Sequence, residues 1–122
     1  MATIATDQDL ITLVNVFTVE PERQAALVDL LAGATTAVIN RFPGYVSANI
    51  HRSLDGTKVV NYAQWRRAED YEAMLADPTV QQHLSQAAAA AVSFEPHLYR
   101  VEFTDQAPQA LYQTSVPEGP TT

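Results

Sequence analysis

The amino-acid sequence predicts an α+β fold of the ferredoxin-like type, in which an antiparallel four-stranded sheet carries its helices on one face. Three observations lead to this prediction. Segments of strand and helix periodicity follow one another in the order βαββααβ. A hairpin signal joins the second and third strands, and the other strand-to-strand crossings run through helices. We expect one domain over residues 10–104, a flexible lead at 1–9 and a tail at 105–122, within which residues 110–112 are expected to dock.

The first half of this order begins with a strand from Leu10 to Val19, a run rich in β-branched residues. Pro21 suits the first turn of a helix, where its missing N–H costs nothing. Apolar residues at helical spacing extend this helix to Phe42, and Pro43-Gly44 stops it. A mostly buried strand followed by an amphipathic helix is therefore predicted.

The second half begins with a strand from Tyr45 to Ser53, and Leu54-Asp55-Gly56 signals a hairpin into the third strand. A short helix is predicted from about Ala68 to Ala76. Asp77-Pro78 has the form of an N-cap followed by proline at the first helical position, which predicts another helix. Alternating apolar residues predict the fourth strand from Leu98 to Thr104.

Composition limits the classes of function. The 122 residues carry a net charge of −7, and the seven lysines and arginines are scattered, which disfavours nucleic acid and acidic membrane surfaces as partners. No cysteine is present, so disulfides, thiolate metal sites and cysteine nucleophiles are excluded. The first apolar run, Leu10 to Val19, is too short to span a membrane, and the N-terminus has no basic leader. A soluble cytoplasmic protein is expected.

The face of the predicted sheet away from the helices also carries apolar residues, namely Val14, Val16 and Val60. A second copy of the chain, packed sheet to sheet, would cover them. We therefore expect a homodimer.

Polar side chains interrupt apolar faces at three positions, two on predicted strands and one on a predicted helix. Side chains alternate along a strand, so Asn61 shares an otherwise apolar face with Trp65, the only tryptophan of the chain. Asn15 lies among apolar neighbours in the first strand, and Tyr71 lies on the apolar face of the following helix. Buried polar groups need hydrogen-bond partners, so either this protein or a ligand must supply them.

Several motifs resemble the antibiotic biosynthesis monooxygenase family over about Leu10 to Thr104. They are Phe42-Pro43-Gly44-Tyr45, the run from Asn61 to Trp65, and Glu69-Asp70-Tyr71 after it. The spacing of Asn61 and Trp65, together with Asn15, resembles most the cofactor-independent anthrone oxygenases of aromatic polyketide biosynthesis.

The resemblance implies a dimeric α+β barrel that oxidises an anthrone-type aromatic polyketide to the quinone with O2. It implies no flavin, haem or metal. Asn15, Asn61 and Trp65 would be the catalytic hydrogen-bond donors, and the substrate would be bound by Tyr71, His83, His51 and Met74. The residues agree with a cofactor-free reaction, since the sequence has no G-x-G-x-x-G turn, no P-loop and no metal-ligand spacing of its three histidines.

The general base is left open by the sequence. His51 and His83 have suitable ordinary pKa values, and water held by the asparagines is a further acceptor. The face of His51 depends on the hairpin. A two-residue loop places Ile50 opposite Asn61, whereas a three-residue loop places Asn49 there.

Other functions of the same fold are alternatives. A haem-degrading branch resembles the chain at Asn15 and, with a one-residue shift, at His83, but Met74 stands where that branch places a second tryptophan. A quinol monooxygenase or an isomerase would share the fold. A binding module without chemistry would direct Asn61 and Trp65 at protein groups rather than into a cavity.

Overall fold

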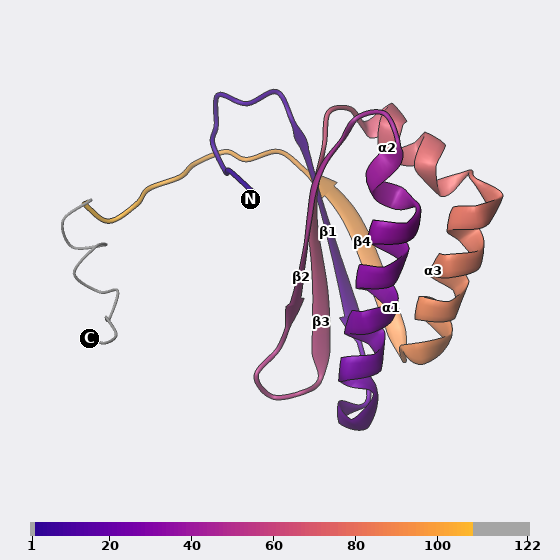
Figure 1. Cartoon of the computed structure of the whole chain (residues 1–122). Coiled ribbons are helices and arrows are strands. Elements are labelled where there is room, and N and C mark those ends of the chain that lie inside the picture. The colour runs from indigo at the N-terminus through magenta and orange to yellow at the C-terminus, as the bar shows by residue number, and fades with distance from the viewer. Residues whose placement is uncertain (1, 109–122) are drawn as a thin grey trace, which may run out of the picture.

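The computed structural model describes residues 2–108, and these form one four-stranded antiparallel sheet with helices on one side (Figure 1). The spatial order of the strands is β2-β3-β1-β4. The predicted ferredoxin-like α+β fold is confirmed. The elements in chain order are β1 (Ile11–Thr18), η1 (Pro21–Arg23), α1 (Gln24–Ala37), η2 (Ile39–Arg41), β2 (Tyr45–Arg52), β3 (Lys58–Trp65), α2 (Ala68–Leu75), α3 (Pro78–Ala90) and β4 (Ser93–Tyr99).

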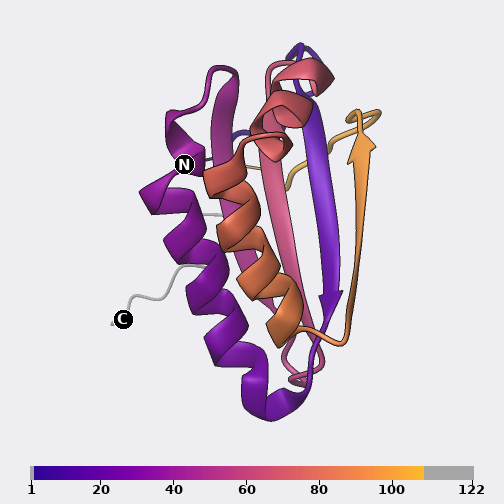
Figure 2. The same ribbon diagram turned by 90° about the vertical axis from the view of Figure 1, so that its right-hand side faces the viewer.

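Two layers build the molecule, with all three α-helices over the same sheet face (Figure 2). The core between the layers consists of two apolar clusters. One lies toward the hairpin end of the sheet and includes Phe17, Leu27 and Val59. The other includes Leu13 and Trp65. Polar residues that fall between these clusters on the covered face are therefore held between sheet and helices.

The first helix is shorter than predicted. The backbone turns from a 3-10 turn into α1 at Gln24 and leaves the helix after Ala37, because Val38 has φ −136° and ψ −52°. The apolar residues that follow, including Ile39, belong to a second 3-10 turn that ends before Phe42. The predicted continuous helix up to Phe42 was therefore wrong in its last five residues.

The fourth strand was placed wrongly by the sequence pattern. It runs from Ser93 to Tyr99 rather than from Leu98 to Thr104, and it pairs with β1 so that Phe94 lies opposite Phe17. Proline is tolerated on an edge strand, and β4 is an edge, so Pro96 lies inside the strand. Residues 101–104 have the alternation of a strand without forming one.

The hairpin register that the sequence left open is the one with Ile50 opposite Asn61. Paired residues point to the same face, so His51, opposite Val60, lies on the sheet face away from the helices. The turn is held by Asp55, whose Oδ1 accepts hydrogen bonds from the Ser53 hydroxyl, at 2.8 Å, and from the Thr57 N–H and hydroxyl, at 3.0 and 2.8 Å. These bonds lower the pKa of Asp55 to about 2.

The other sheet face carries Val14, Val16 and Val60, all partly exposed in the single chain. At one end of this face the N-terminal segment lies against the sheet, where Gln64 Nε2 donates a hydrogen bond to the carbonyl of Thr3 at 2.7 Å. Residues 2–9 and 100–108 contain no helix or strand, and the segment 110–112 predicted to dock lies outside the described residues. Within residues 2–108, every helix is too short or too polar to cross a bilayer.

Candidate active site

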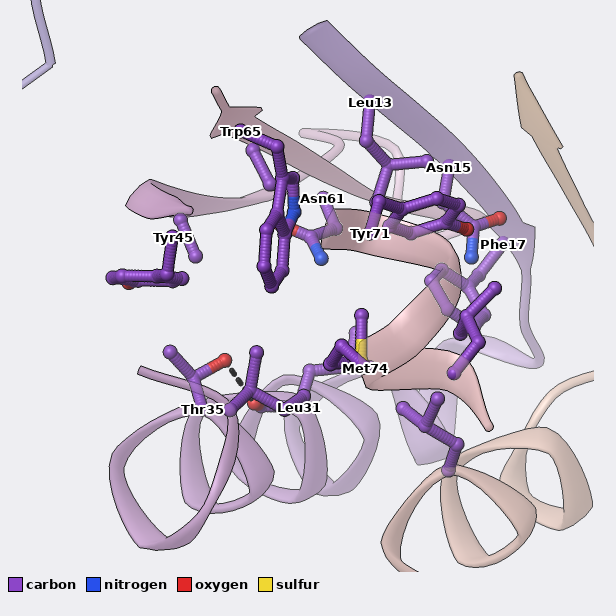
Figure 3. Close-up of a pocket in the computed structure, with 15 residues that line it drawn as sticks. Leu13, Asn15, Phe17, Leu31, Thr35, Tyr45, Asn61, Trp65, Tyr71 and Met74 are labelled. Carbon is purple, nitrogen blue, oxygen red and sulfur yellow. Dashed lines mark hydrogen bonds between the residues drawn. The ribbon is translucent and has the colours of Figure 1, made fainter. Parts of the chain in front are cut away.

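A cavity lies between the sheet and the helices, where the second core cluster leaves space (Figure 3). It encloses about 500 Å³ of empty space, its mouth included, but only about 60 Å³ is open to the centres of water molecules, so it is a narrow slot. The sheet, α1, η2, α2 and α3 all contribute to its lining, which consists of Leu13, Asn15, Phe17, Leu31, Thr35, Ile39, Tyr45, Ala48, Asn61, Ala63, Trp65, Tyr71, Met74, Leu75 and Leu84.

Two asparagines on neighbouring strands form the polar centre of this wall. Asn15 of β1 and Asn61 of β3 are register partners, so their side chains stand side by side on the covered face. The Oδ1 atoms of both are buried and have no hydrogen-bond partner among the described residues. An amide on the opposite face is different, because Asn49 Nδ2 donates to the Tyr62 carbonyl at 3.0 Å. Buried oxygens without partners are rare and costly, so these two oxygens need a hydrogen-bond donor from water or from a ligand.

Trp65 closes the sheet side of the cavity within an aromatic cluster. It is 1% exposed, and its ring meets those of Tyr45 and Tyr71 edge to face, with centroids 5.7 and 6.1 Å apart. Burial raises the pKa of Tyr71, and burial also raises the pKa of Tyr45, against a smaller opposing effect of a hydrogen bond with the Ala48 backbone. Both phenols are therefore neutral at physiological pH and can donate hydrogen bonds.

The helical wall faces the asparagines and Trp65 across the slot (Figure 3). It presents Leu31 and Thr35 from α1 and Met74 from α2. The Thr35 hydroxyl donates to the Leu31 carbonyl at 2.9 Å, which leaves its oxygen free to accept. This wall is otherwise apolar.

A second chamber continues the slot between α3 and β4. It shares Asn15, Phe17, Tyr71, Leu75 and Leu84 with the first, and it is completed by Ala87 and Ala88 of α3 and by Phe94 and Pro96 of β4. Here about 190 Å³ is open to the centres of water molecules, and the lining is mostly apolar. The two chambers therefore adjoin each other across five shared lining residues.

The structure brings together Asn15, Asn61, Trp65, Tyr71 and Met74, five of the seven residues that the sequence singled out. His51 is on the opposite face of the sheet and exposed, and His83, on α3, lines neither chamber. The binding role expected of these two histidines finds no support in this geometry, because the register and the helical rotation direct them elsewhere.

Thr35 and Tyr45 line the cavity although the sequence did not single them out. Within residues 2–108, no group of three or more histidine or acidic side chains is placed to hold a metal ion. The polar groups of the slot are thus neutral amides, phenols, an indole and one hydroxyl. Such a set can hydrogen-bond to an anionic or phenolic ligand without placing a fixed charge in an apolar space.

Comparison with known proteins identifies the family. Residues 10–86 match the family described as antibiotic biosynthesis monooxygenase. The chain belongs to this family. The tetracenomycin-F1 monooxygenase of Streptomyces glaucescens is 55% identical to it over 83 residues, which cover 68% of this chain and 74% of the relative. The resemblance seen in the sequence is confirmed.

Solved structures of two oxygenases have the same fold. SnoaB, a cofactor-independent oxygenase from Streptomyces nogalater, matches with a TM-score of 0.69 at 28% identity, over 79% of this chain and 96% of that one. A monooxygenase from the gene ActVA-Orf6 of Streptomyces coelicolor, solved with the ligand nanaomycin D, matches with a TM-score of 0.72 at 29% identity, over 80% and 92% of the two chains. The prediction of an enzyme of the monooxygenase type is confirmed.

If the protein were a binding module without catalytic activity, Asn61 and Trp65 would be directed at protein groups. Instead both line a cavity, and the Asn61 oxygen has no protein partner among the described residues. This geometry counts against that alternative.

Proposed function

We propose that this family member oxidises an anthrone-type aromatic polyketide to the quinone with O2, without flavin, haem or metal. The observation that carries the proposal is the pair of unpartnered amides, Asn15 and Asn61, beside Trp65 in a narrow slot. The activity in the name of the 55% identical relative and the ligand of the Streptomyces coelicolor structure support an aromatic polyketide as the substrate class.

The first step is loss of a proton from the anthrone carbon, which gives a delocalised anion with charge on its carbonyl oxygen. The Asn61 amide N–H, the Trp65 indole N–H and the Tyr71 hydroxyl are neutral donors that can stabilise this oxyanion. One such donor is commonly worth about 2.7–4 kcal/mol in the transition state. The account therefore assigns the main catalytic effect to hydrogen bonds that stabilise the anion.

Water or a substrate hydroxyl bound by the asparagines takes part in this proton transfer. The buried Oδ1 atoms of Asn15 and Asn61 accept from O–H donors and orient them. A side-chain amide has an acceptor and donors on the same group, so each asparagine can hold a hydroxyl and an oxyanion at neighbouring positions. The proton leaves to water bound in this way.

The oxidation then needs no other reductant than the substrate. The anion passes one electron to O2, and the resulting carbon radical and superoxide combine into a peroxide, which takes up the proton. Loss of water from the C–H hydroperoxide leaves the new carbonyl. One anthrone CH2 and one O2 thus give one quinone carbonyl and one water. The slot holds the radical pair together and keeps bulk water away from it.

The proposal includes a homodimer that packs sheet against sheet. The face with Val14, Val16 and Val60 is partly exposed in the single chain, and an isologous contact would bury it. Light scattering after size exclusion at micromolar concentration should give twice the mass of the 13.3 kDa chain. A stable monomer under these conditions would contradict the dimer.

The test of the function is oxygen consumption with dithranol, an anthrone, by protein treated with a metal chelator and supplied with no flavin. We expect turnover above the rate in buffer and no effect of chelation. Abolition of turnover by the chelator, or a rate equal to that of buffer, would refute the proposed function.

A further inference from the structure

The two adjoining chambers differ in the chemistry of their linings. Asn61, Trp65, Thr35 and Tyr45 line the inner chamber and are absent from the lining of the outer one. The outer chamber has instead the side chains of Ala87, Ala88, Phe94 and Pro96, none of which has a side-chain donor or acceptor. Asn15 and Tyr71 lie where the chambers join. Polar partners are thus offered to one end of a ligand and apolar contacts to the other.

The inner chamber contains one hydroxyl group, that of Thr35, that can only accept hydrogen bonds from a ligand. The Thr35 hydroxyl proton is used in the 2.9 Å hydrogen bond to the Leu31 carbonyl, so a ligand meets the oxygen lone pairs. Asn61 and Trp65 lie across the slot from Thr35 (Figure 3). A ligand that fills this end meets donors on the sheet side and an acceptor on the helix side. A hydroxyl group on the ring is the matching donor for Thr35.

The inner chamber is the narrower of the two. About 60 Å³ of it is open to the centres of water molecules. The outer chamber offers more space, about 190 Å³ by the same measure, and shares five lining residues with the inner one. A flat molecule of three or more rings that enters the slot is therefore expected to extend into the space between α3 and β4.

We infer that the substrate binds end-on, with its hydroxylated edge inward on Thr35 and its hydrocarbon edge in the outer chamber against Ala88 and Phe94. The inference rests on the proposed function for the class of substrate. Thr35 then determines specificity for a ring hydroxyl, and the small side chain of Ala88 sets how long the bound molecule can be. The reacting carbon lies between the ends, beside Asn15 and Tyr71.

Binding can be measured without turnover, because Trp65 is the only tryptophan and lines the inner chamber. Quenching of its fluorescence by dithranol, which has two ring hydroxyls, and by unsubstituted anthrone is titrated anaerobically. Thr35→Val should weaken dithranol binding about tenfold, the loss of one hydrogen bond to a buried hydroxyl, and leave anthrone binding unchanged. Thr35→Ser should restore dithranol binding.

The matched control for Thr35 is Thr36, the next residue of α1. Its hydroxyl makes the same kind of bond, to the Ala32 carbonyl at 3.1 Å, but it is exposed to solvent. Thr36→Val should leave both affinities unchanged. Equal effects of Thr35→Val on dithranol and anthrone, or no effect on either, would overturn the role of Thr35.

The outer chamber is tested by Ala88→Leu, with Ala89→Leu at an exposed position of the same helix as control. The larger side chain should weaken dithranol binding at least tenfold and leave binding of 1-naphthol, which has two rings and one hydroxyl, unchanged. Equal weakening of both probes, or of neither, would overturn the end-on orientation.

The same titrations separate this inference from the proposed function. Failure of the wild-type protein to bind dithranol contradicts the inference. Discrimination between the probes by the variants, together with no oxygen consumption above buffer, would support the binding mode and refute the oxygenase function.

Discussion

Replacement of Asn61 by leucine should make the protein more stable and less active. The Asn61 oxygen is buried without a protein partner among the described residues, and such a group costs about 1–3 kcal/mol of stability. Leucine has a similar shape and no polar atom, so the substitution removes this cost. If leucine recovers about 1–2 kcal/mol, the midpoint of thermal unfolding should rise by about 4 °C for each kcal/mol in a domain of this size.

The same substitution removes a donor to the oxyanion. The loss of about 2.7–4 kcal/mol of transition-state stabilisation lowers kcat by a factor of about 100 to 1000. Stability is measured by thermal unfolding at fixed protein concentration, and kcat by oxygen consumption with dithranol.

Asn49→Leu is the matched control. This amide lies on the adjacent strand, on the opposite face, and its Nδ2 donates to the Tyr62 carbonyl at 3.0 Å. Its replacement should lower the unfolding temperature, because it removes this hydrogen bond, and should leave kcat unchanged. A fall in stability with Asn61→Leu, at unchanged kcat, would show that Asn61 is a structural amide and refute the site.

Three further predictions concern single side chains. Trp65→Phe keeps an aromatic ring in the cluster but removes the indole N–H, so kcat should fall about 100-fold with near-native circular dichroism; an unchanged kcat would remove Trp65 from the catalytic set. Tyr71 has a raised pKa, so the folded state holds its proton as pH passes 10 while the unfolded state releases it, and stability falls with rising pH. Tyr71→Phe should therefore lose less stability than wild type between pH 9 and 11 in urea unfolding, and equal losses would contradict this. Asp55, with its pKa lowered to about 2, stabilises the hairpin above pH 3.8 and loses this effect as pH falls through 2. Asp55→Asn should thus be less stable than wild type at pH 7 and equal to it below pH 2, as thermal melts at both pH values can check.

The sequence predicted the sheet side of the site because two simple periodicities place it. Alternation along β1 and β3 directs Asn15, Asn61 and Trp65 to one face, and the helical repeat places Tyr71 and Met74 opposite the sheet. The order of the helices and strands could also be predicted from the sequence, since proline, glycine and hairpin signals separate most of the elements.

The remaining site residues depend on contacts that a local pattern does not contain. Tyr45 faces the cavity because an irregularity between Tyr45 and Ser47 shifts the register and places it opposite Trp65. Thr35 looks like a polar surface residue until the position of α1 over the sheet is known. The hairpin register decided the position of His51, and the sequence allowed two registers.

The fourth strand was misplaced for a related reason. Pro96 argues against a central strand, but β4 lies at an edge, where its missing N–H removes no ladder bond. Strand order is a property of the whole sheet, so the exception could not be recognised from the residues near Pro96.

The most direct test of the central claim is the fate of 18O2 during oxidation of dithranol by metal-stripped, flavin-free protein. We predict one labelled oxygen in the new quinone carbonyl and the other in water, at a rate above that of buffer. A quinone that carries no label from 18O2, or labelled product formed no faster than in buffer alone, would contradict oxidation of the bound anthrone by this protein.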